Sequence, residues 1–471
     1  MSMSNFEFDN EDEVNVLELV QQYEQSLKNN HTPFFEQDDF EVIIEYYEER
    51  NQFDSALEVA EKSLLQYPYS SILLLKKAQL FFEMKQIDAS LEILEKAEIF
   101  DSNELGIYLL RAEIFSFQSK YKEAIFILED QLEKVEQEDL ADVYLQLCDV
   151  YEDWGKYAEV YDNLILCLKV EPNNEEALNR FNYCIEITER FKESIPIHQK
   201  MIDENPYNQF AWYNLASAYR GCGQDDEAIN AYEYVLAINE EADFVYQDIA
   251  EIHFKNNEYQ KALDILQEML ATYEPDEEVF YLQGQCHEAL GEMKMARYCY
   301  RKAVHENPSL SEAYFRIGET YKHEGLWEQA YKSFQKANEL EKEQYEFCLA
   351  MAEAALEIGE TEVSIDACET AIDIFVKRYE AYFVLAKIMA VNGDTETAKE
   401  IAQKGIEVCK STIELQYAIC AITYMENQPK HGEILLRMLL EENYAMNDIL
   451  FEFYDELKTD ANIQKIIAEY N

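Results

Sequence analysis

Two histidines, His253 and His287, stand 34 residues apart in the sequence. Side chains that recur at one spacing can be brought to one face of a stacked array, as a metal site requires. Tyr219 and Tyr321 occupy the equivalent positions of neighbouring segments, where a ring packs between helices. We therefore interpret the two histidines as packing residues rather than metal ligands, and we expect no metal and no cofactor.

Other residues with reactive side chains form no catalytic pattern. The sequence carries no Gly-rich phosphate loop, no HExxH, no GxSxG and no CxxC motif. Its ten cysteines are scattered, which is typical of reduced thiols in the cytosol rather than of a disulfide framework. The N-terminal residues lack the basic and apolar regions of a secretory signal, and no stretch reaches the roughly 20 apolar residues of a membrane span. We predict a cytoplasmic protein that is not an enzyme.

The charge balance indicates which partners the protein attracts. The chain has 39 basic and 96 acidic residues, a net charge of −57. Nucleic acid and anionic membrane surfaces are disfavoured, because both draw binding energy from Lys and Arg. A basic protein or peptide would be attracted. The charge could equally serve only to keep a long chain soluble, and it gives no indication of the oligomeric state.

Small residues recur along the chain at a spacing that predicts paired helices. Glycine (12) and proline (8) are scarce in the 471 residues, which favours helices joined by short turns. Most of the recurring positions are 34 residues apart, with one step of 36. They are Ala56, Ser90, Ala124, Val160, Ser194, Ala228, Ala262, Ala296, Ala330, Ser364, Ala398 and Gly432. A second row of mostly small residues lies twelve positions earlier, for example Ala78 and Ala352.

A turn position lies five residues before each member of the first row. It holds Gly155, Gly223, Gly291, Gly325, Gly359 and Gly393, and Asn51, Asn257 and Asn427 in three other copies. Glycine and asparagine tolerate the left-handed backbone that ends a helix. The copies around Ser90 and Ser194 lack the turn glycine.

Two copies show the fullest pattern. They carry Trp212, Leu215, Ala216, Tyr219, Gly223, Ala228 and Tyr232, and Tyr314, Ile317, Gly318, Tyr321, Gly325, Ala330 and Phe334. This pattern resembles the tetratricopeptide repeat, which reads W-x-x-L-G-x-x-Y, then A-x-x-x-F, then P, over about 34 residues. His198 and Cys368 replace the aromatic residue of the A-x-x-x-F part. The resemblance implies an all-α fold, a right-handed α-solenoid superhelix of antiparallel helix pairs.

The repeat sets the expected organisation of the chain. We expect an acidic N-terminal tail and capping helix over residues 1–36, about twelve repeats over 37–444, and C-terminal capping helices over 445–471. The 36-residue step adds two residues near 132–138, and Pro196 falls inside a second helix, where it would start the helix late or kink it. These irregularities predict a bend between residues 130 and 200.

The resemblance further implies that the first helix of each repeat lines a concave groove. The positions facing this groove are rich in acids, and aromatic residues lie between them. The candidate partner-binding residues are Tyr213, Glu251, Tyr281, Glu312, Phe315, Glu319, Glu346, Glu353, Glu380 and Phe383. Such a surface suits a basic segment, through charge pairing and cation–π contacts. In the alternative interpretation, the acids are simply solvated and the aromatic rings pack on adjacent repeats.

These observations favour a scaffold or adaptor that binds a basic protein or peptide segment. A chaperone or assembly factor shielding a basic client is an alternative, and a peptide-binding regulatory sensor is another. A groove that clamps an acidic C-terminal tail is disfavoured, because this groove has the wrong sign.

Overall fold

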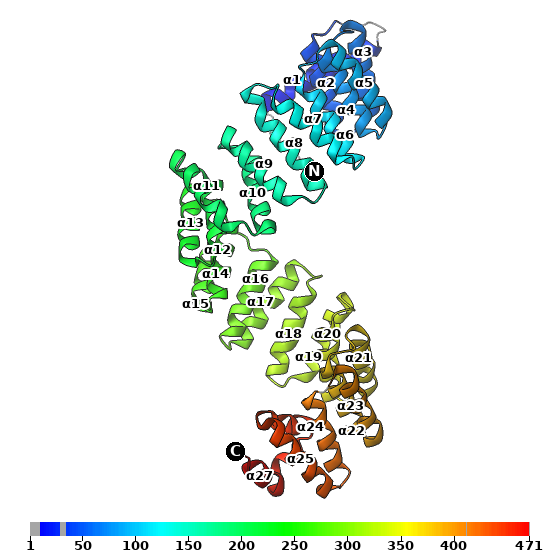
Figure 1. The fold of residues 1–471 in the computed structure, drawn as a ribbon, viewed down its shortest axis with the longest axis vertical. Helices are drawn as coiled ribbons and strands as arrows, with labels where there is room; N and C mark the ends of the chain where they lie inside the picture. Colours follow the sequence, from blue (N-terminus) through cyan, green and yellow to red (C-terminus); the bar gives the residue numbers. More distant parts are fainter. Residues whose placement is uncertain (1–9, 29–33, 411, 471) are drawn as a thin grey trace. The chain divides into compact units, whose positions relative to one another are not determined.

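The protein is helical throughout the part that the structure describes. The computed structural model describes residues 10–28, 34–410 and 412–470. These residues form 27 α-helices and three short 3-10 helices, with no β-strand among them (Figure 1). The predicted all-α class is therefore confirmed. Residues 1–9 of the expected acidic tail lie outside the described residues.

The chain divides into two compact units, which we call unit 1 (up to Glu241) and unit 2 (from Ala242). In unit 1 a first helix, α1 (Asn10–Lys28), precedes six helix pairs. These pairs are α2 (Gln37–Glu49) and α3 (Phe53–Gln66), α4 (Ser71–Glu83) and α5 (Ile87–Phe100), α6 (Leu105–Phe117) and α7 (Tyr121–Leu132), α8 (Leu140–Asp153) and α9 (Tyr157–Val170), α10 (Glu175–Thr188) and α11 (Phe191–Glu204), and α12 (Gln209–Gly221) and α13 (Asp225–Ile238).

Unit 2 also holds six helix pairs, followed by two short helices. The pairs are α14 (Phe244–Lys255) and α15 (Tyr259–Met269), α16 (Glu277–Ala289) and α17 (Met293–Glu306), α18 (Ser311–His323) and α19 (Trp327–Leu340), α20 (Tyr345–Glu357) and α21 (Thr361–Ile374), α22 (Tyr379–Val391) and α23 (Thr395–Cys409), and α24 (Ile413–Met425) and α25 (Pro429–Asn443). The closing helices are α26 (Asp448–Phe453) and α27 (Ala461–Ala468).

The two rows of small residues bring the helices of a pair together. The hydroxyl of Ser90 donates to the carbonyl of Ala78 at 2.7 Å, and that of Ser364 donates to the carbonyl of Ala352 at 2.6 Å. At Gly284, an added Cβ would lie 2.4 Å from the ring of Tyr300, which no relaxed contact allows. The small side chains are therefore required because the two backbones of a pair approach closely.

All twelve turn positions adopt the left-handed backbone, including those without glycine. The six glycines have φ between 71° and 88°, and the three asparagines between 56° and 61°. The remaining three positions hold Lys85, Ser119 and Glu189, with φ of 59°, 59° and 55°. The turn geometry is thus kept even where the residue type disfavours it.

Each helix pair buries its apolar face against the next pair. In unit 1, one core cluster joins Ala112 of α6 and Ala124 of α7 to Val143 and Leu147 of α8. The aromatic positions of the second helices form the centre of the stack, and Tyr161, Tyr232, Tyr300 and Phe334 have no exposed surface. One pair alone could not exclude water from these rings, so the pairs stabilise one another.

Two irregularities have local effects. The segment near 132–138, which holds the two extra residues, includes the start of a 3-10 turn, Gln137–Asp139, between α7 and α8. Helix α11 begins at Phe191, so Pro196 lies inside it and does not delay its start. The kink and the bend remain predictions.

Candidate partner-binding surfaces

The first helices of unit 2 are joined side to side by ion pairs. Arg316 of α18 lies between two carboxylates, with Nη1 3.7 Å from Oε1 of Glu288 on α16 and Nε 3.3 Å from Oε1 of Glu312. Nζ of Lys322 lies 2.6 Å from Oε2 of Glu353 on α20. Side chains that are about 30 residues apart in sequence therefore meet on one surface.

The same arrangement continues along the next two helices. Nη1 of Arg378, the residue that precedes α22, lies 2.6 Å from Oε1 of Glu346 on α20, and its Nη2 lies 3.5 Å from Oε1 of Glu380. Nζ of Lys322 also lies 3.8 Å from Oε1 of Glu319. We call this set the unit 2 ion-pair row; its members are Glu288, Glu312, Arg316, Glu319, Lys322, Glu346, Glu353, Arg378 and Glu380.

Five of the predicted site residues belong to this row: Glu312, Glu319, Glu346, Glu353 and Glu380. Each of the five has a cation of the same unit within ion-pair distance, so the row neutralises part of its own charge. Among the other predicted residues, Glu251 is exposed on α14, and Tyr213 belongs to unit 1.

Most of the predicted aromatic residues pack within their own repeat. The rings of Tyr213, Tyr281 and Phe315 are half-buried. Their centroids lie 5.5, 5.5 and 5.6 Å from the rings of Tyr232, Tyr300 and Phe334, on the second helices. The alternative interpretation expected packing on adjacent repeats, and of these three rings Phe315 also stacks on Phe347 of the next repeat, with centroids 5.0 Å apart. These contacts leave a partner only the exposed portions of the rings.

Phe383 is not available to a partner in this structure. Its side chain is 6% exposed, because Phe453 of the closing helix α26 packs on it edge to face, with centroids 5.3 Å apart. The prediction that Phe383 faces an open groove is therefore wrong. A position on a first helix is covered here by a segment that lies outside the repeats.

Burial and neighbouring charges set the protonation of the row. Burial raises the pKa of Glu319. Burial works to lower the pKa of Lys322, but the carboxylates of Glu353 and Glu319 outweigh it and the pKa is raised. The hydrogen bond from Arg378 lowers the pKa of Glu346. The cations of the row therefore remain charged at neutral pH.

The closing helix α26 borders this row. Glu452 of α26 contributes to the raised pKa of Lys322 on α18 and to that of Tyr379 on α22. Its neighbour in sequence, Phe453, covers Phe383. The sequence predicted closing helices but gave no signal that one of them would lie beside the predicted site.

Unit 1 carries a second group of acids, with different surroundings. Glu48, Glu83 and Glu113 lie on α2, α4 and α6, and we call them the unit 1 acidic row. No ion pair joins any of them to a cation in the described part of the chain. The side chain of Glu113 is exposed, but the surrounding protein reduces the solvation of its carboxylate, and this raises its pKa. The negative charges of Glu83 and Asp149 raise the pKa further. Burial raises the pKa of Glu48.

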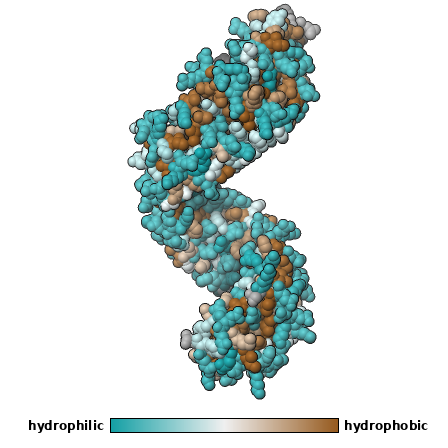
Figure 2. Space-filling model, in the orientation of Figure 1, coloured by the Kyte–Doolittle hydropathy of each residue, from teal (hydrophilic) through white to brown (hydrophobic). Residues whose placement is uncertain are grey.

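Unit 1 also holds cations among the acids of its first helices. Nζ of Lys76 on α4 lies 2.7 Å from Oε1 of Glu45 on α2, and one arginine, Arg180, pairs with three carboxylates. The guanidinium of Arg180 lies 2.8 Å from Asp149, 3.1 Å from Glu152 and 3.2 Å from Glu176. Its partners Asp149 and Glu152 belong to α8 and Glu176 belongs to α10, so this group is remote in sequence from Glu48. Figure 2 shows one face of the molecule, on which hydrophilic residues surround smaller patches of apolar residues.

His253 and His287, which were considered as possible metal ligands, each lie beside a glutamate. Nδ1 of His253 lies 2.7 Å from Oε2 of Glu258, and Nδ1 of His287 lies 2.7 Å from Oε2 of Glu292. In the described residues, His, Cys, Asp and Glu form no group of three or more that could hold a metal ion. No helix there is both long and apolar enough to span a membrane.

Comparisons with known proteins match parts of the chain. Residues 49–131 and 221–303 match the family model described as anaphase-promoting complex, cyclosome, subunit 3. Residues 311–344 match the family model of the tetratricopeptide repeat. In the comparison with curated proteins, none matches this chain.

Several solved structures are similar to this chain at low identity. YrrB, described as a TPR protein with an unusual peptide-binding site, is 21% identical, with 39% of this chain and 95% of YrrB covered and a TM-score of 0.34. The C-terminal part of a TPR repeat-containing protein from Cytophaga hutchinsonii is 16% identical, with coverages of 54% and 98% and a TM-score of 0.43. The APC/C hetero-tetramer Cut9–Hcn1 is 12% identical, with coverages of 96% and 98% and a TM-score of 0.36.

Proposed function

This chain is a tetratricopeptide repeat protein, and we propose that it is a non-catalytic scaffold or adaptor whose unit 2 ion-pair row binds a basic segment of a protein partner. The observation that carries the proposal is the side-to-side joining of α16, α18, α20 and α22 by side chains of the row. A single extended surface of this kind can contact a segment that runs across several repeats.

The charge of the row favours a basic segment. Its six carboxylates face three cations, since the row holds Glu288, Glu312, Glu319, Glu346, Glu353 and Glu380 against Arg316, Lys322 and Arg378. A carboxylate that already pairs with one cation keeps further lone-pair positions for a second donor. Lysine or arginine side chains of a partner would complete the neutralisation, and the net charge of −57 would speed their approach.

The thiols support a reducing compartment, and we propose the cytoplasm. All ten cysteines are free in the structure, and eight of them are buried. Cys148 and Cys420 stand at small positions of first helices, and the thiol of each lies near the carbonyl of the residue twelve positions later. They act as small packing residues, which disulfide formation would disturb.

The test is a binding titration with a labelled decapeptide of alternating lysine and alanine, and a glutamate–alanine decapeptide as the opposite-charge control. The triple variant Glu312→Lys, Glu319→Lys, Glu353→Lys should weaken lysine-peptide binding by at least about 50-fold, since three attractive charges become repulsive. Binding to the unaltered protein should also weaken steeply as salt rises. Fluorescence anisotropy measures both effects, and circular dichroism establishes that the variant is folded.

The matched control reverses three exposed acids on second helices of the same unit, Asp366, Glu369 and Glu400. It produces the same change in net charge but leaves the row unaltered. Equal weakening in the two triple variants would mean that net charge alone drives binding, and unweakened binding in the row variant would overturn the proposal.

The two alternatives differ from a scaffold in the lifetime of the complex. A chaperone or assembly factor would bind a basic client transiently and suppress its aggregation. A regulatory sensor would bind one short peptide tightly and change shape on binding. Capture at low and high salt, followed by dissociation-rate measurements on the captured protein, separates these outcomes from a stable scaffold complex.

A further inference from the structure

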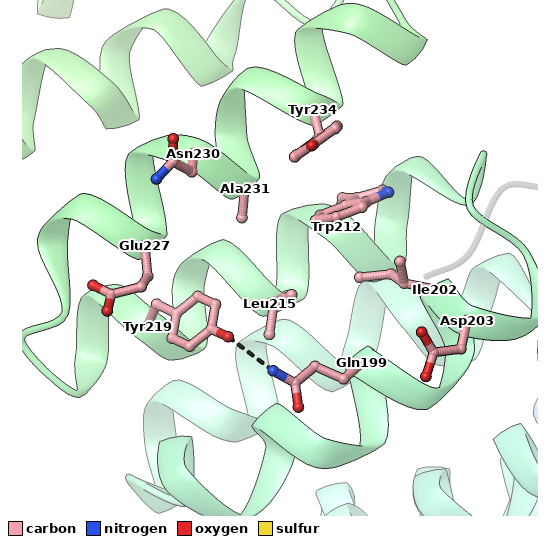
Figure 3. A pocket seen from close by; sticks show the side chains of 10 residues that line it. All are labelled: Gln199, Ile202, Asp203, Trp212, Leu215, Tyr219, Glu227, Asn230, Ala231 and Tyr234. Atoms are coloured by element: carbon pink, nitrogen blue, oxygen red, sulfur yellow. Dashed lines mark hydrogen bonds between the residues drawn. The ribbon is translucent and has the colours of Figure 1, made fainter.

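Unit 1 contains a pocket that the proposed function does not use. It has a volume of about 460 Å³ and lies between the second helix α11 and the helix pair α12–α13 (Figure 3). Its lining residues are Gln199, Ile202, Asp203, Trp212, Leu215, Tyr219, Glu227, Asn230, Ala231 and Tyr234. They include Trp212, Leu215 and Tyr219, which the sequence pattern assigns to packing.

The pocket is on a different side of α12 from the predicted groove residue Tyr213. Trp212, Leu215 and Tyr219 are three and four residues apart, so they lie on one face of the helix. Tyr213 is rotated by about 100° from Trp212 along the helix, away from Leu215 and Tyr219. A ligand of this pocket would therefore not compete for the surface of Tyr213.

Apolar and aromatic side chains form the interior of the pocket. Leu215 and Ala231 are buried at 4% and 3% exposure. The ring of Trp212 stacks on that of Tyr234, with centroids 4.3 Å apart and an angle of 19° between the planes. The indole Nε1 of Trp212 donates to the carbonyl of Pro206 at 2.9 Å, which fixes the ring before any ligand arrives.

The polar groups of the pocket include two acids, besides the amides of Gln199 and Asn230 and the hydroxyls of Tyr219 and Tyr234. Asp203 and Glu227 are exposed, and neither has an ion pair with a cation in the described residues. Nε2 of Gln199 donates to the hydroxyl of Tyr219 at 2.9 Å, which orients the amide and leaves its oxygen free to accept (Figure 3). Lys200, the nearest lysine in sequence, lies 3.6 Å from Glu204 and does not line the pocket.

We propose that this pocket binds an arginine side chain of a protein partner. The three methylene groups of arginine would lie against Leu215 and Ala231. The planar guanidinium would stack on an aromatic face, as Trp212 and Tyr219 allow, and would donate to Asp203 or Glu227. A purely apolar side chain would gain nothing from the two carboxylates, and a lysine could not stack as a plane.

The test uses the capped amino acid Nα-acetyl-arginine N-methylamide and its uncharged isostere, the corresponding citrulline compound. Both are titrated into the full-length protein while the indole N–H signals are followed by NMR. The three tryptophans are Trp154, Trp212 and Trp327, and Trp212→Phe identifies the signal of Trp212. Only the arginine compound should shift the Trp212 signal in a saturable way, at millimolar concentrations, and the other two signals should not move.

A charge variant tests the role of the rim. Asp203→Asn with Glu227→Gln should weaken binding of the arginine compound by at least about fivefold, because both anionic acceptors are lost. The matched control, Asp226→Asn with Glu233→Gln, removes two exposed acids of α13 that do not line the pocket, and it should change binding by less than about twofold.

Three results would overturn the proposal. One is an unshifted Trp212 signal, and another is an equal shift with the citrulline compound, which would indicate that the pocket does not recognise the positive charge. The third is equal weakening in the two double variants. The triple reversal in the unit 2 ion-pair row should leave the Trp212 response unchanged, so this test is independent of the function proposed for that row.

Discussion

The unit 2 ion-pair row and the unit 1 acidic row have different surroundings. In the unit 2 ion-pair row, Arg316, Lys322 and Arg378 each lie between two or more carboxylates. In the unit 1 acidic row, Glu48 and Glu113 have no such bridge, and the protein around them raises the pKa of both. Unit 1 also buries His198 completely, with no hydrogen-bond partner for either ring nitrogen.

This difference teaches that acidic composition alone does not define a binding surface. A carboxylate that is crowded but unpaired costs folding free energy, whereas a paired one contributes to holding adjacent helices together. We therefore expect the unpaired polar groups of unit 1, Glu48, Glu113 and His198, to weaken that unit, and the paired groups of the unit 2 row to stabilise unit 2. The following predictions test this contrast.

The largest expected effect is the difference in peptide affinity between reversing the acids of unit 1 and reversing those of unit 2. Reversing the unit 1 acidic row with Glu48→Lys, Glu83→Lys and Glu113→Lys should change affinity for the lysine–alanine decapeptide by less than about threefold at physiological salt, where charges are screened beyond about 8 Å. The unit 2 triple reversal is expected to weaken it by at least about 50-fold. If the unit 1 variant were the one that lost binding, the unpaired acids would be the site and our assignment would be wrong.

The next effect concerns the stability of unit 2. Lys322→Met removes the cation between Glu319 and Glu353 and leaves two half-buried carboxylates unneutralised. We expect the free energy of unfolding to fall by about 1–2 kcal/mol, between the values of exposed and fully buried pairs. Lys336→Met, which breaks one exposed pair with Glu339, is the control and should change it by less than about 0.5 kcal/mol. Urea denaturation measures both.

A gain of stability is expected in unit 1 from His198→Phe. The ring already packs against Phe181, with centroids 5.2 Å apart, at a position where other repeats hold an aromatic residue. Removing two buried nitrogens that lack partners should stabilise the protein by about 1 kcal/mol at pH 7. An unchanged or lower free energy of unfolding would show that the imidazole is better accommodated than its contacts indicate.

His198 also gives this prediction a pH dependence. Burial lowers the pKa of its imidazole to about 3. The unfolded chain binds the proton near pH 6.5 and the folded chain does not, so stability is present above pH 6.5 and falls as the pH drops toward 3. The gain from His198→Phe should therefore increase between pH 7 and pH 5, as denaturation at the two pH values would show.

The smallest effect is expected at Glu113. Its pKa is raised, so the folded protein favours the protonated form and stability falls as the pH rises through the carboxylate range. Glu113→Gln should raise Tm on the order of 1 °C at pH 7 and leave it unchanged near pH 3. Glu92→Gln is the control with the opposite sign, because the hydrogen bond from Lys96 lowers the pKa of Glu92. A lower Tm for Glu113→Gln would contradict the contrast between the units.

Local sequence patterns were sufficient to predict the helix pairs. The small residues lie where helices touch, as the contact of Ser90 with Ala78 shows. The turn positions with glycine or asparagine were predicted, whereas the copies around Ser90 and Ser194 were noted only as lacking the glycine; Lys85 and Glu189 nevertheless take the left-handed backbone there. Neighbouring repeats hold these turns in place, so one copy can tolerate a residue that would not form the turn alone.

The candidate site was only partly predictable. The sequence indicated the acids on the first helices, but Arg316 and Arg378 stand outside the positions expected to face the groove. Their long side chains reach the acids of a neighbouring helix, which residue spacing alone does not reveal. The pocket on α11, α12 and α13 was missed, because the residues of the repeat motif were interpreted as fully packed.

The sequence by itself determined the repeat, the class of each element and the excess of acids, because these depend on spacing within about 34 residues and on composition. Only the tertiary structure decided which acids are neutralised, which aromatic rings are covered and where a cavity stays open. Phe383 illustrates the reason. Its burial depends on Phe453, 70 residues later, and the packing of such distant segments is set by the stacking of all the repeats between them.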